Sequence, residues 1–231
     1  MAKTKLEHFA DMKTMDCVFE PLLETLQGDT FPLKGKWNKE FFKNDNPIIV
    51  ELGCGKGEYT VELAKKYPNK NYIGIDVKGA RIWYGADTVR TLELKNAAFV
   101  RLRIDFILSI FEENEVDEIW LTFSDPQKEK PRKRLTSKMF MDRFRKILKP
   151  DGLIHLKTDS DILFESTEEQ IAEAIKQLTW NENILIEGAA ALAFAAFLVD
   201  KSLYREKVNI VLLCGGNYDK NVILPIISQT L

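Results

Sequence analysis

The segment LTFSDPQKEKPRKRL, residues 121–135, places one aspartate, Asp125, after an apolar run and then five cations within seven residues. These cations are Lys128, Lys130, Arg132, Lys133 and Arg134. A carboxylate accepts hydrogen bonds from the amide and amino groups of a small ligand, whereas Lys and Arg side chains contact phosphates. The segment therefore predicts a carboxylate that faces a small ligand beside a cationic loop that faces a polyanion. A solvated surface loop is the alternative that these residues leave open.

Acidic residues also end four other apolar segments of the chain. The five predicted strands span residues 48–52, 71–76, 97–105, 116–125 and 153–159, and the acids at or near their ends are Glu51, Asp76, Asp105, Asp125 and Asp159. Stretches with helical periodicity separate the strands, at 58–67, 78–95 and 136–152, and another follows at 160–178. This alternation predicts an α/β fold with a mostly parallel sheet and helices on both faces. Because parallel strands end at one edge, we expect the five acids to converge there and form a ligand crevice.

The glycine-rich segment VELGCGKGEYT, residues 50–60, follows the first of these strands. A dinucleotide-binding turn has the pattern GxGxxG, but here the third glycine position is occupied by Glu58, whose carboxylate would repel a pyrophosphate. Glu51 lies two residues before the first glycine, Gly53, and suits an amine better than a phosphate. These features favour S-adenosylmethionine, which carries an amino-acid group and a sulfonium but no phosphate, over a nicotinamide dinucleotide.

Composition limits the other classes of function. The 231 residues are 45% hydrophobic and 29% charged, which is typical of a soluble globular protein with a sizeable core, and the net charge of −2 confines any polyanion site to a local patch. The three cysteines, Cys17, Cys54 and Cys214, form no CxxC pair and favour a reducing, cytoplasmic environment. With only His8 and His155, a metal site is not expected, and the apolar run at 189–199 is shorter than the ~20 residues that span a membrane.

Several motifs together resemble the bacterial tRNA (guanine-N7)-methyltransferases. They are LKGKWNKEFF, VELGCGKGEYT, IGIDVKGAR, VDEIWLTFSDP, RKRLTS and LKPDGLIHLKTDS, and the likeness runs from about Lys5 to Glu168. The resemblance implies a Rossmann-like class I methyltransferase fold and methylation of a guanine in the tRNA variable loop, at position 46. We therefore expect an N-terminal arm at 1–46 and a methyltransferase domain at 47–231, with an atypical part from about residue 184.

The resemblance also implies a set of site residues. The cofactor-binding set is Glu51, Gly53, Gly55, Asp76, Asp105, Phe106 and Asp125, and the substrate-binding set is Lys128, Lys130 and Asp159. In this assignment Glu51 and the glycines hold the methionine part of S-adenosylmethionine, Asp76 the ribose hydroxyls, and Asp105 with Phe106 the adenine. Asp125 is the expected catalytic residue. It would position the guanine rather than remove a proton, because guanine N7 attacks through an in-plane lone pair.

The C-terminal part departs from the family pattern. The family's Thr-x-aromatic-Glu motif has only an out-of-register echo in KSLYRE, residues 201–206. Two alternatives therefore stay open: a methyltransferase with another substrate, and a cofactor- and RNA-binding protein with impaired activity. The expected partner is tRNA, with no membrane and no metal, and the chain is expected to be a monomer or a homodimer.

Overall fold

The computed structural model describes residues 4–167, 172, 175 and 220–228. The chain divides into two compact units, of which the first comprises Met1–Asp125 with Arg143–Thr158 and the second comprises Pro126–Asp142 with Asp159–Leu231. The first unit holds a parallel sheet, whose strands are β1 (Val18–Phe19), β2 (Ile48–Leu52), β3 (Asn71–Asp76), β4 (Ala97–Arg101), β5 (Val116–Thr122) and β6 (Leu148–Lys157).

The strand order in this sheet is β1-β4-β3-β2-β5-β6. The chain therefore builds outward from β2 in one direction through β3 and β4, and then in the other direction through β5 and β6. A parallel sheet opens a crevice at such a reversal, beyond the carboxyl ends of the two central strands. In this protein that switch point lies between β2 and β5, where Leu52 is paired with Leu121.

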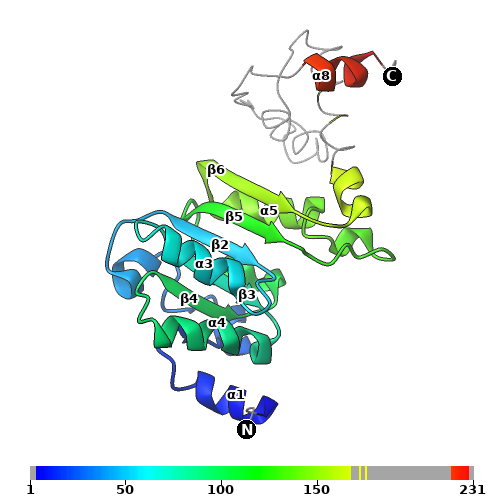
Figure 1. Cartoon of the computed structure of the whole chain (residues 1–231). Coiled ribbons are helices and arrows are strands. Elements are labelled where there is room, and N and C mark those ends of the chain that lie inside the picture. Colours follow the sequence, from blue (N-terminus) through cyan, green and yellow to red (C-terminus); the bar gives the residue numbers. More distant parts are fainter. Residues whose placement is uncertain (1–3, 168–171, 173–174, 176–219, 229–231) are drawn as a thin grey trace. The chain divides into compact units, whose positions relative to one another are not determined.

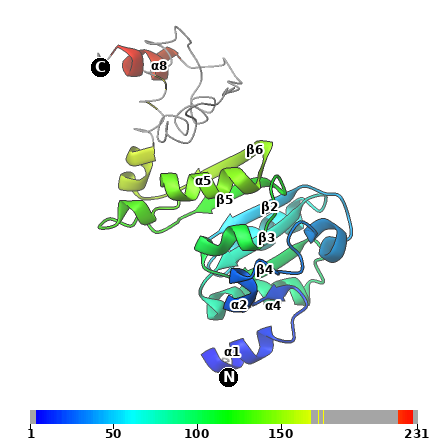
Figure 2. The same cartoon turned by 180° about the vertical axis from the view of Figure 1, so that it is seen from behind.

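The helices of the first unit cover the sheet because apolar residues on both of its faces need to be buried. They include α1 (Lys5–Met12), α2 (Leu23–Gln27), the π-helix η1 (Trp37–Phe42), α3 (Glu58–Lys66), α4 (Gly79–Thr91) and the 3₁₀ helix η2 (Ile104–Ser109). In Figure 1, α3 lies in front of β2 and β3, and the view from behind in Figure 2 brings α2 to the front. On the α3 and α4 side, Gly57 and Gly85 approach the ring of Phe99, which is fully buried.

Three further helices are η3 (Pro131–Lys133), α5 (Lys138–Ile147) and α8 (Lys220–Ile227). Residues 161–167 are also helical, as predicted for the start of the stretch at 160–178. The rest of that stretch, except residues 172 and 175, lies outside the described residues. Within the described part of the chain, no helix combines the length and apolarity needed to cross a bilayer.

The predicted strands at 48–52 and 71–76 are confirmed, whereas the bounds of the other three predicted strands differ, and the one predicted at 153–159 spans Leu148–Lys157. The segment at 97–105 leaves the sheet after Arg101, and the segment at 116–125 leaves it after Thr122. The predicted helix end at Pro150–Gly152 is wrong, because those residues belong to β6. The pairing with β5 passes from Leu148 directly to Leu153, so the proline and glycine lie in a bulge-like irregularity, where they cost little.

The N-terminal segment packs against the rest of the first unit. Its strand β1 pairs with β4, and the indole of Trp37 is fully buried and donates a 2.9 Å hydrogen bond to the carbonyl of Ile110. On α1, His8 stacks on Trp83 with 4.1 Å between ring centroids. These contacts extend the sheet and its core into residues that the sequence predicts as an arm, and the domain boundary at residue 46 stays a prediction.

Candidate active site

The loop after β2 adopts a conformation that suits glycine. Gly53, Gly55 and Gly57 have φ angles of +77°, +58° and +74°, in the left-handed region. A Cβ added at Gly57 would lie 2.4 Å from the ring of Phe99, whereas one added at Gly53 or Gly55 would meet nothing within 4 Å. Gly57 is therefore required for packing, while Gly53 and Gly55 line open space at the carboxyl end of β2. That open space allows a ligand to approach the backbone closely.

Glu51, the last acid of β2, is buried and locked between two elements. Its Oε2 accepts hydrogen bonds from the amide and hydroxyl of Thr60, at 2.9 and 2.5 Å, and its Oε1 accepts one from the hydroxyl of Thr122 at 2.6 Å. Burial raises the pKa of Glu51 above its usual value, against the opposing effect of these hydrogen bonds. The carboxylate thus ties α3 and β5 to β2 directly beneath the glycine loop.

Asp76 ends β3 and organises the same loop. Its Oδ2 accepts a 2.9 Å hydrogen bond from the amide of Gly55, and its Oδ1 accepts a 2.7 Å bond from the amide of Lys78. The carboxylate therefore lies next to the open glycines. The lone pairs that these bonds leave available can accept further hydrogen bonds from ligand hydroxyls.

Asp105 does not end a strand, because the chain turns into η2 (Ile104–Ser109) after β4. Its carboxylate forms an ion pair with Arg103 at 3.2 Å and lies 3.7 Å from Nη1 of Arg143. Phe106, beside it, is partly buried and interrupts the helical geometry with φ −98° and ψ 16°. Both residues lie on the β3–β4 side of the switch point.

On the other side of the switch point, Asp125 follows β5 by three residues and is exposed. The neighbouring Ser124 is 9% exposed, and its hydroxyl is among the buried side-chain atoms of the described residues for which no hydrogen-bond partner is found. An unsatisfied buried hydroxyl is costly, and a ligand that bonds to it removes that cost.

The remaining predicted site residues belong to the second unit. Lys128 and Lys130 are exposed, and the latter donates its amide to the carbonyl of Gln127 at 3.0 Å. The loop is braced by Arg134, whose Nε donates a 2.8 Å hydrogen bond to the carbonyl of Pro126. Asp159 is exposed at a bend. Glu51, Asp76, Asp105 and Asp125 thus lie in the first unit, and Asp159 in the second.

The cations that follow this loop in the sequence differ in their surroundings. Arg145 and Lys146 are exposed on α5, but Lys149 lies in β6 and pairs with Asp117 at 2.7 Å. Lys149 is therefore held at the opposite edge of the sheet from the glycine loop.

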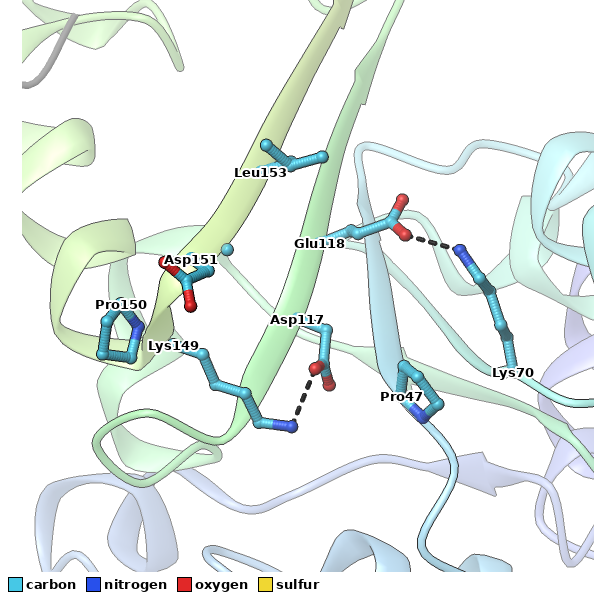
Figure 3. Close-up of a pocket in the computed structure, with 9 residues that line it drawn as sticks. Pro47, Lys70, Asp117, Glu118, Lys149, Pro150, Asp151 and Leu153 are labelled. Atoms are coloured by element: carbon cyan, nitrogen blue, oxygen red, sulfur yellow. Dashed lines mark hydrogen bonds and ion pairs between the residues drawn. The ribbon is translucent and has the colours of Figure 1, made fainter. Parts of the chain in front are cut away.

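A pocket of about 420 Å³ opens at that opposite edge (Figure 3). Four of its lining residues form two ion pairs: Lys70 bonds to Glu118 at 2.6 Å, and Lys149 to Asp117 at 2.7 Å. The volume would suit a small ligand. However, the pocket lies at the starts of the strands, and ligand sites of parallel sheets form beyond their ends. We interpret it as a structural network of ion pairs.

His155 lies in β6, as predicted, where it stacks on Trp120 at 4.4 Å between ring centroids, and its Nε2 is 3.0 Å from Glu118. In the described ranges, no group of three or more potential ligand side chains is arranged to hold a metal ion.

Sequence reasoning missed several residues at the carboxyl edge. Thr60 and Thr122 hold Glu51, and Tyr59, Phe123 and Lys157 form a cluster described below. A polar residue at the carboxyl end of an apolar strand, such as Thr122, is the sequence signal that indicates a hydrogen-bond partner for a buried acid. The echo of the family's C-terminal motif at 201–206 lies outside the described residues.

Known proteins with similar sequences agree on one family. A family model described as "Putative methyltransferase" matches residues 45–192. A tRNA (guanine-N(7)-)-methyltransferase of Bacteroides fragilis (strain YCH46) is 55% identical over 75% of this chain and 69% of that protein, and one of Cytophaga hutchinsonii is 39% identical over 80% and 83%.

Among solved structures, the aminoglycoside resistance methyltransferase NpmB1 matches with a TM-score of 0.50 at 18% identity, over 68% of this chain and 82% of that chain. That likeness concerns the fold alone, and together with the strand order it confirms the predicted Rossmann-like class I methyltransferase fold. From the matched sequence and the fold, the chain belongs to the tRNA (guanine-N7)-methyltransferase family.

Proposed function

We propose that this protein transfers a methyl group from S-adenosylmethionine to N7 of a guanine in tRNA, at position 46 of the variable loop. The observation that carries the proposal is the open pair Gly53 and Gly55, at the carboxyl end of β2, with Asp76 bonded to the loop. The family to which the chain belongs supports both the donor and the acceptor.

The residues around the loop fit S-adenosylmethionine. When bound, it supplies a methyl group activated by a sulfonium. The open backbone at Gly53 and Gly55 would admit its methionine part, and the negative charge of Glu51 beneath the loop favours an ammonium group. Asp76 would accept from the ribose hydroxyls, and Asp105 with Phe106 would hold the adenine. No phosphate-binding role is needed at Glu58, which is exposed in the first turn of α3.

Asp125 would orient the acceptor base. Its carboxylate suits the N1–H and exocyclic amine of guanine, which are both donors on one edge of the ring. N7 lies elsewhere on the ring and needs no base, because it carries no proton. The enzyme's contribution is then to hold N7 in line with the methyl group at ~3–3.5 Å and to complement the positive charge that develops on the purine.

The exposed cations of the second unit would bind the tRNA backbone. Lys128 and Lys130 lie in a loop with Arg132, Lys133 and Arg134, and phosphate contacts of this kind position RNA without reading its sequence. Asp159 would contact the substrate from the same unit. We propose that the active form is a monomer or a homodimer.

The experiment that tests this function is nucleoside analysis of tRNA after incubation with the purified protein and S-adenosylmethionine. We expect 7-methylguanosine, and sequencing of the modified tRNA should locate it in the variable loop. Methyl transfer to a small molecule or a protein but not to tRNA would support the alternative substrate class. Binding of S-adenosylhomocysteine and tRNA without any transfer would support a binding protein with impaired activity.

A further inference from the structure

Three side chains at the carboxyl edge of the first unit form a cluster that we call the aromatic platform: Tyr59, Phe123 and Lys157. The rings of Tyr59 and Phe123 are 6.4 Å apart between centroids. The ammonium of Lys157 donates a 2.6 Å hydrogen bond to the Tyr59 hydroxyl and lies 5.2 Å and 5.4 Å from the two ring centroids. Lys157 thus holds Tyr59 by a hydrogen bond and contacts the ring of Phe123 through a cation–π interaction.

Phe123 is exposed and its backbone is strained. The residue is 50% exposed, so its ring is only partly covered. Its φ angle of +49° lies in the left-handed region, which a bulky side chain adopts only when the surroundings impose it. Part of that constraint comes from its amide, which donates a 2.7 Å hydrogen bond to the carbonyl of Lys157. A strained aromatic residue that is half exposed at a strand end contributes little to core packing, and this points to a role in binding.

The platform adjoins the proposed methyl-transfer site along the chain. Tyr59 immediately precedes Thr60, and Phe123 immediately follows Thr122, the two residues that hold Glu51. Phe123 is also followed by Ser124, whose hydroxyl is buried without a partner, and then by Asp125. The platform is therefore fixed to the base of the glycine loop by residues that are themselves buried.

The strand order separates the platform from the adenine side. Asp76 ends β3 and Asp105 follows β4, on one side of the switch point, whereas Phe123 follows β5 and Lys157 ends β6, on the other. A ligand at the platform and an adenosine held by Asp76 and Asp105 would then occupy different halves of the crevice.

We propose that the aromatic platform stacks the target guanine of the substrate, with Phe123 in contact with the base and with Tyr59 and Lys157 as positioning residues that hold its ring. This inference rests on the proposed function. Single-stranded or extruded bases are recognised by stacking on aromatic side chains together with hydrogen bonds to their edges. Phe123 would supply the stacking surface and Asp125 the edge contacts, two residues apart on one loop.

The first test compares Phe123→Leu with Phe123→Trp in the full-length protein. Stacking on one aromatic side chain corresponds to a loss of roughly 10- to 100-fold on removal, so kcat/KM for tRNA should fall by that factor in Phe123→Leu. Phe123→Trp keeps a π-face and should stay within about threefold of wild type. The affinity for S-adenosylhomocysteine should change less than threefold in both, because the adenosine lies on the other side of the switch point.

A matched control, Tyr67, lies at the other end of α3, the helix that carries Tyr59. Tyr67 follows α3, is 40% exposed, and has the ammonium of Lys66 at 5.3 Å from its ring centroid. Like Phe123, it is an exposed aromatic residue with a lysine ammonium near its ring, but it lies far from the carboxyl ends of the strands. Tyr67→Leu should leave kcat/KM for tRNA unchanged. A loss equal to that of Phe123→Leu would overturn the inference.

The second test uses the strain at Phe123 to separate binding from folding. Asparagine tolerates a positive φ far better than phenylalanine. Phe123→Asn should therefore keep or raise the melting temperature while it lowers tRNA turnover at least tenfold. A lowered melting temperature together with lowered turnover would mean that Phe123 serves packing, and the inference would be wrong.

The outcomes distinguish this inference from the function on which it rests. If the wild-type protein forms no 7-methylguanosine in tRNA, the proposed function fails and the inference fails with it. If the wild type is active and Phe123→Leu is equally active, only the inference fails. Weaker binding of S-adenosylhomocysteine in Phe123→Leu, with KM for tRNA unchanged, would assign the platform to the cofactor and overturn the inference.

Discussion

The three glycines after β2 allow packing and ligand binding to be separated with single methyl groups. Replacing any of them by alanine places a Cβ on a residue with φ between +58° and +77°, which costs about 1–2 kcal/mol. At Gly57 the new methyl would also lie 2.4 and 2.6 Å from two ring atoms of Phe99, which has no exposed surface and cannot move into solvent. Overpacking of a core adds about 1–3 kcal/mol.

We therefore expect Gly57→Ala to destabilise the protein by about 2–5 kcal/mol and Gly55→Ala by only about 1–2 kcal/mol. The effect on cofactor affinity should be the opposite, with the larger loss in Gly55→Ala. The methyl group of Gly55→Ala meets no protein atom within 4 Å, so it occupies the space into which the ligand must fit. The affinity of the Gly55→Ala variant for S-adenosylhomocysteine should fall by about tenfold or more, which corresponds to ~1.4 kcal/mol. It should also fall by more than the affinity of the Gly57→Ala variant.

Chemical denaturation gives the free energies of unfolding, and calorimetric titration with S-adenosylhomocysteine, at a temperature where each variant is folded, gives the affinities. Gly53→Ala serves as a second probe of the open space, because its Cβ also meets nothing within 4 Å. Equal destabilisation by Gly55→Ala and Gly57→Ala, or wild-type affinity in Gly55→Ala, would refute the assignment of the open glycines to the cofactor.

Three further predictions concern the acids and the cationic loop. Asp125→Asn should lose most turnover, at least about 100-fold, with the affinity for S-adenosylhomocysteine nearly unchanged, since the carboxylate complements charge that develops only in the transition state; equal loss in both measurements would contradict this role. Burial raises the pKa of Glu51, so the stability from its protonated form is fully present below the usual carboxyl pKa and is lost as the pH rises through the raised value. The melting temperature of Glu51→Gln relative to wild type should therefore increase as the pH rises above the usual carboxyl pKa, and a pH-independent difference would argue against the shift. Replacement of both Lys128 and Lys130 by Gln should weaken tRNA binding and reduce the slope of log affinity against log salt by about 1–2, since each phosphate contact contributes roughly 0.7–0.9; an unchanged slope would leave these lysines without a phosphate role.

The local features of this fold could be predicted from the sequence. The strands at 48–52 and 71–76 are short apolar runs between turn residues, and the structure places them within the same bounds. The glycine loop was equally visible, because a turn with positive φ angles requires residues without a Cβ. The ends of helices and strands differ from the prediction where strand pairing outweighs the local helix propensity. Leu148 joins β6 through its contact with Val116, and this draws a predicted helix end into the sheet.

Contacts between residues that lie far apart in the sequence could not be predicted from it. Glu51 is held by Thr60, nine residues away on the next helix, and by Thr122, 71 residues away on β5. No local pattern relates Lys149 to Asp117, although the two form an ion pair at the edge of the sheet opposite the glycine loop.

The residues that could do chemistry can thus be predicted from the sequence, because strand periodicity, turn glycines and acid positions are local properties of the chain. Tertiary structure decided which of them act together. The reversal of strand order between β2 and β5 brings segments from distant parts of the sequence to one edge, and it divides the residues beyond that edge into two sides. The positive φ at Phe123 is likewise constrained in part by the hydrogen bond from its amide to the carbonyl of Lys157, which requires that β5 and β6 are paired.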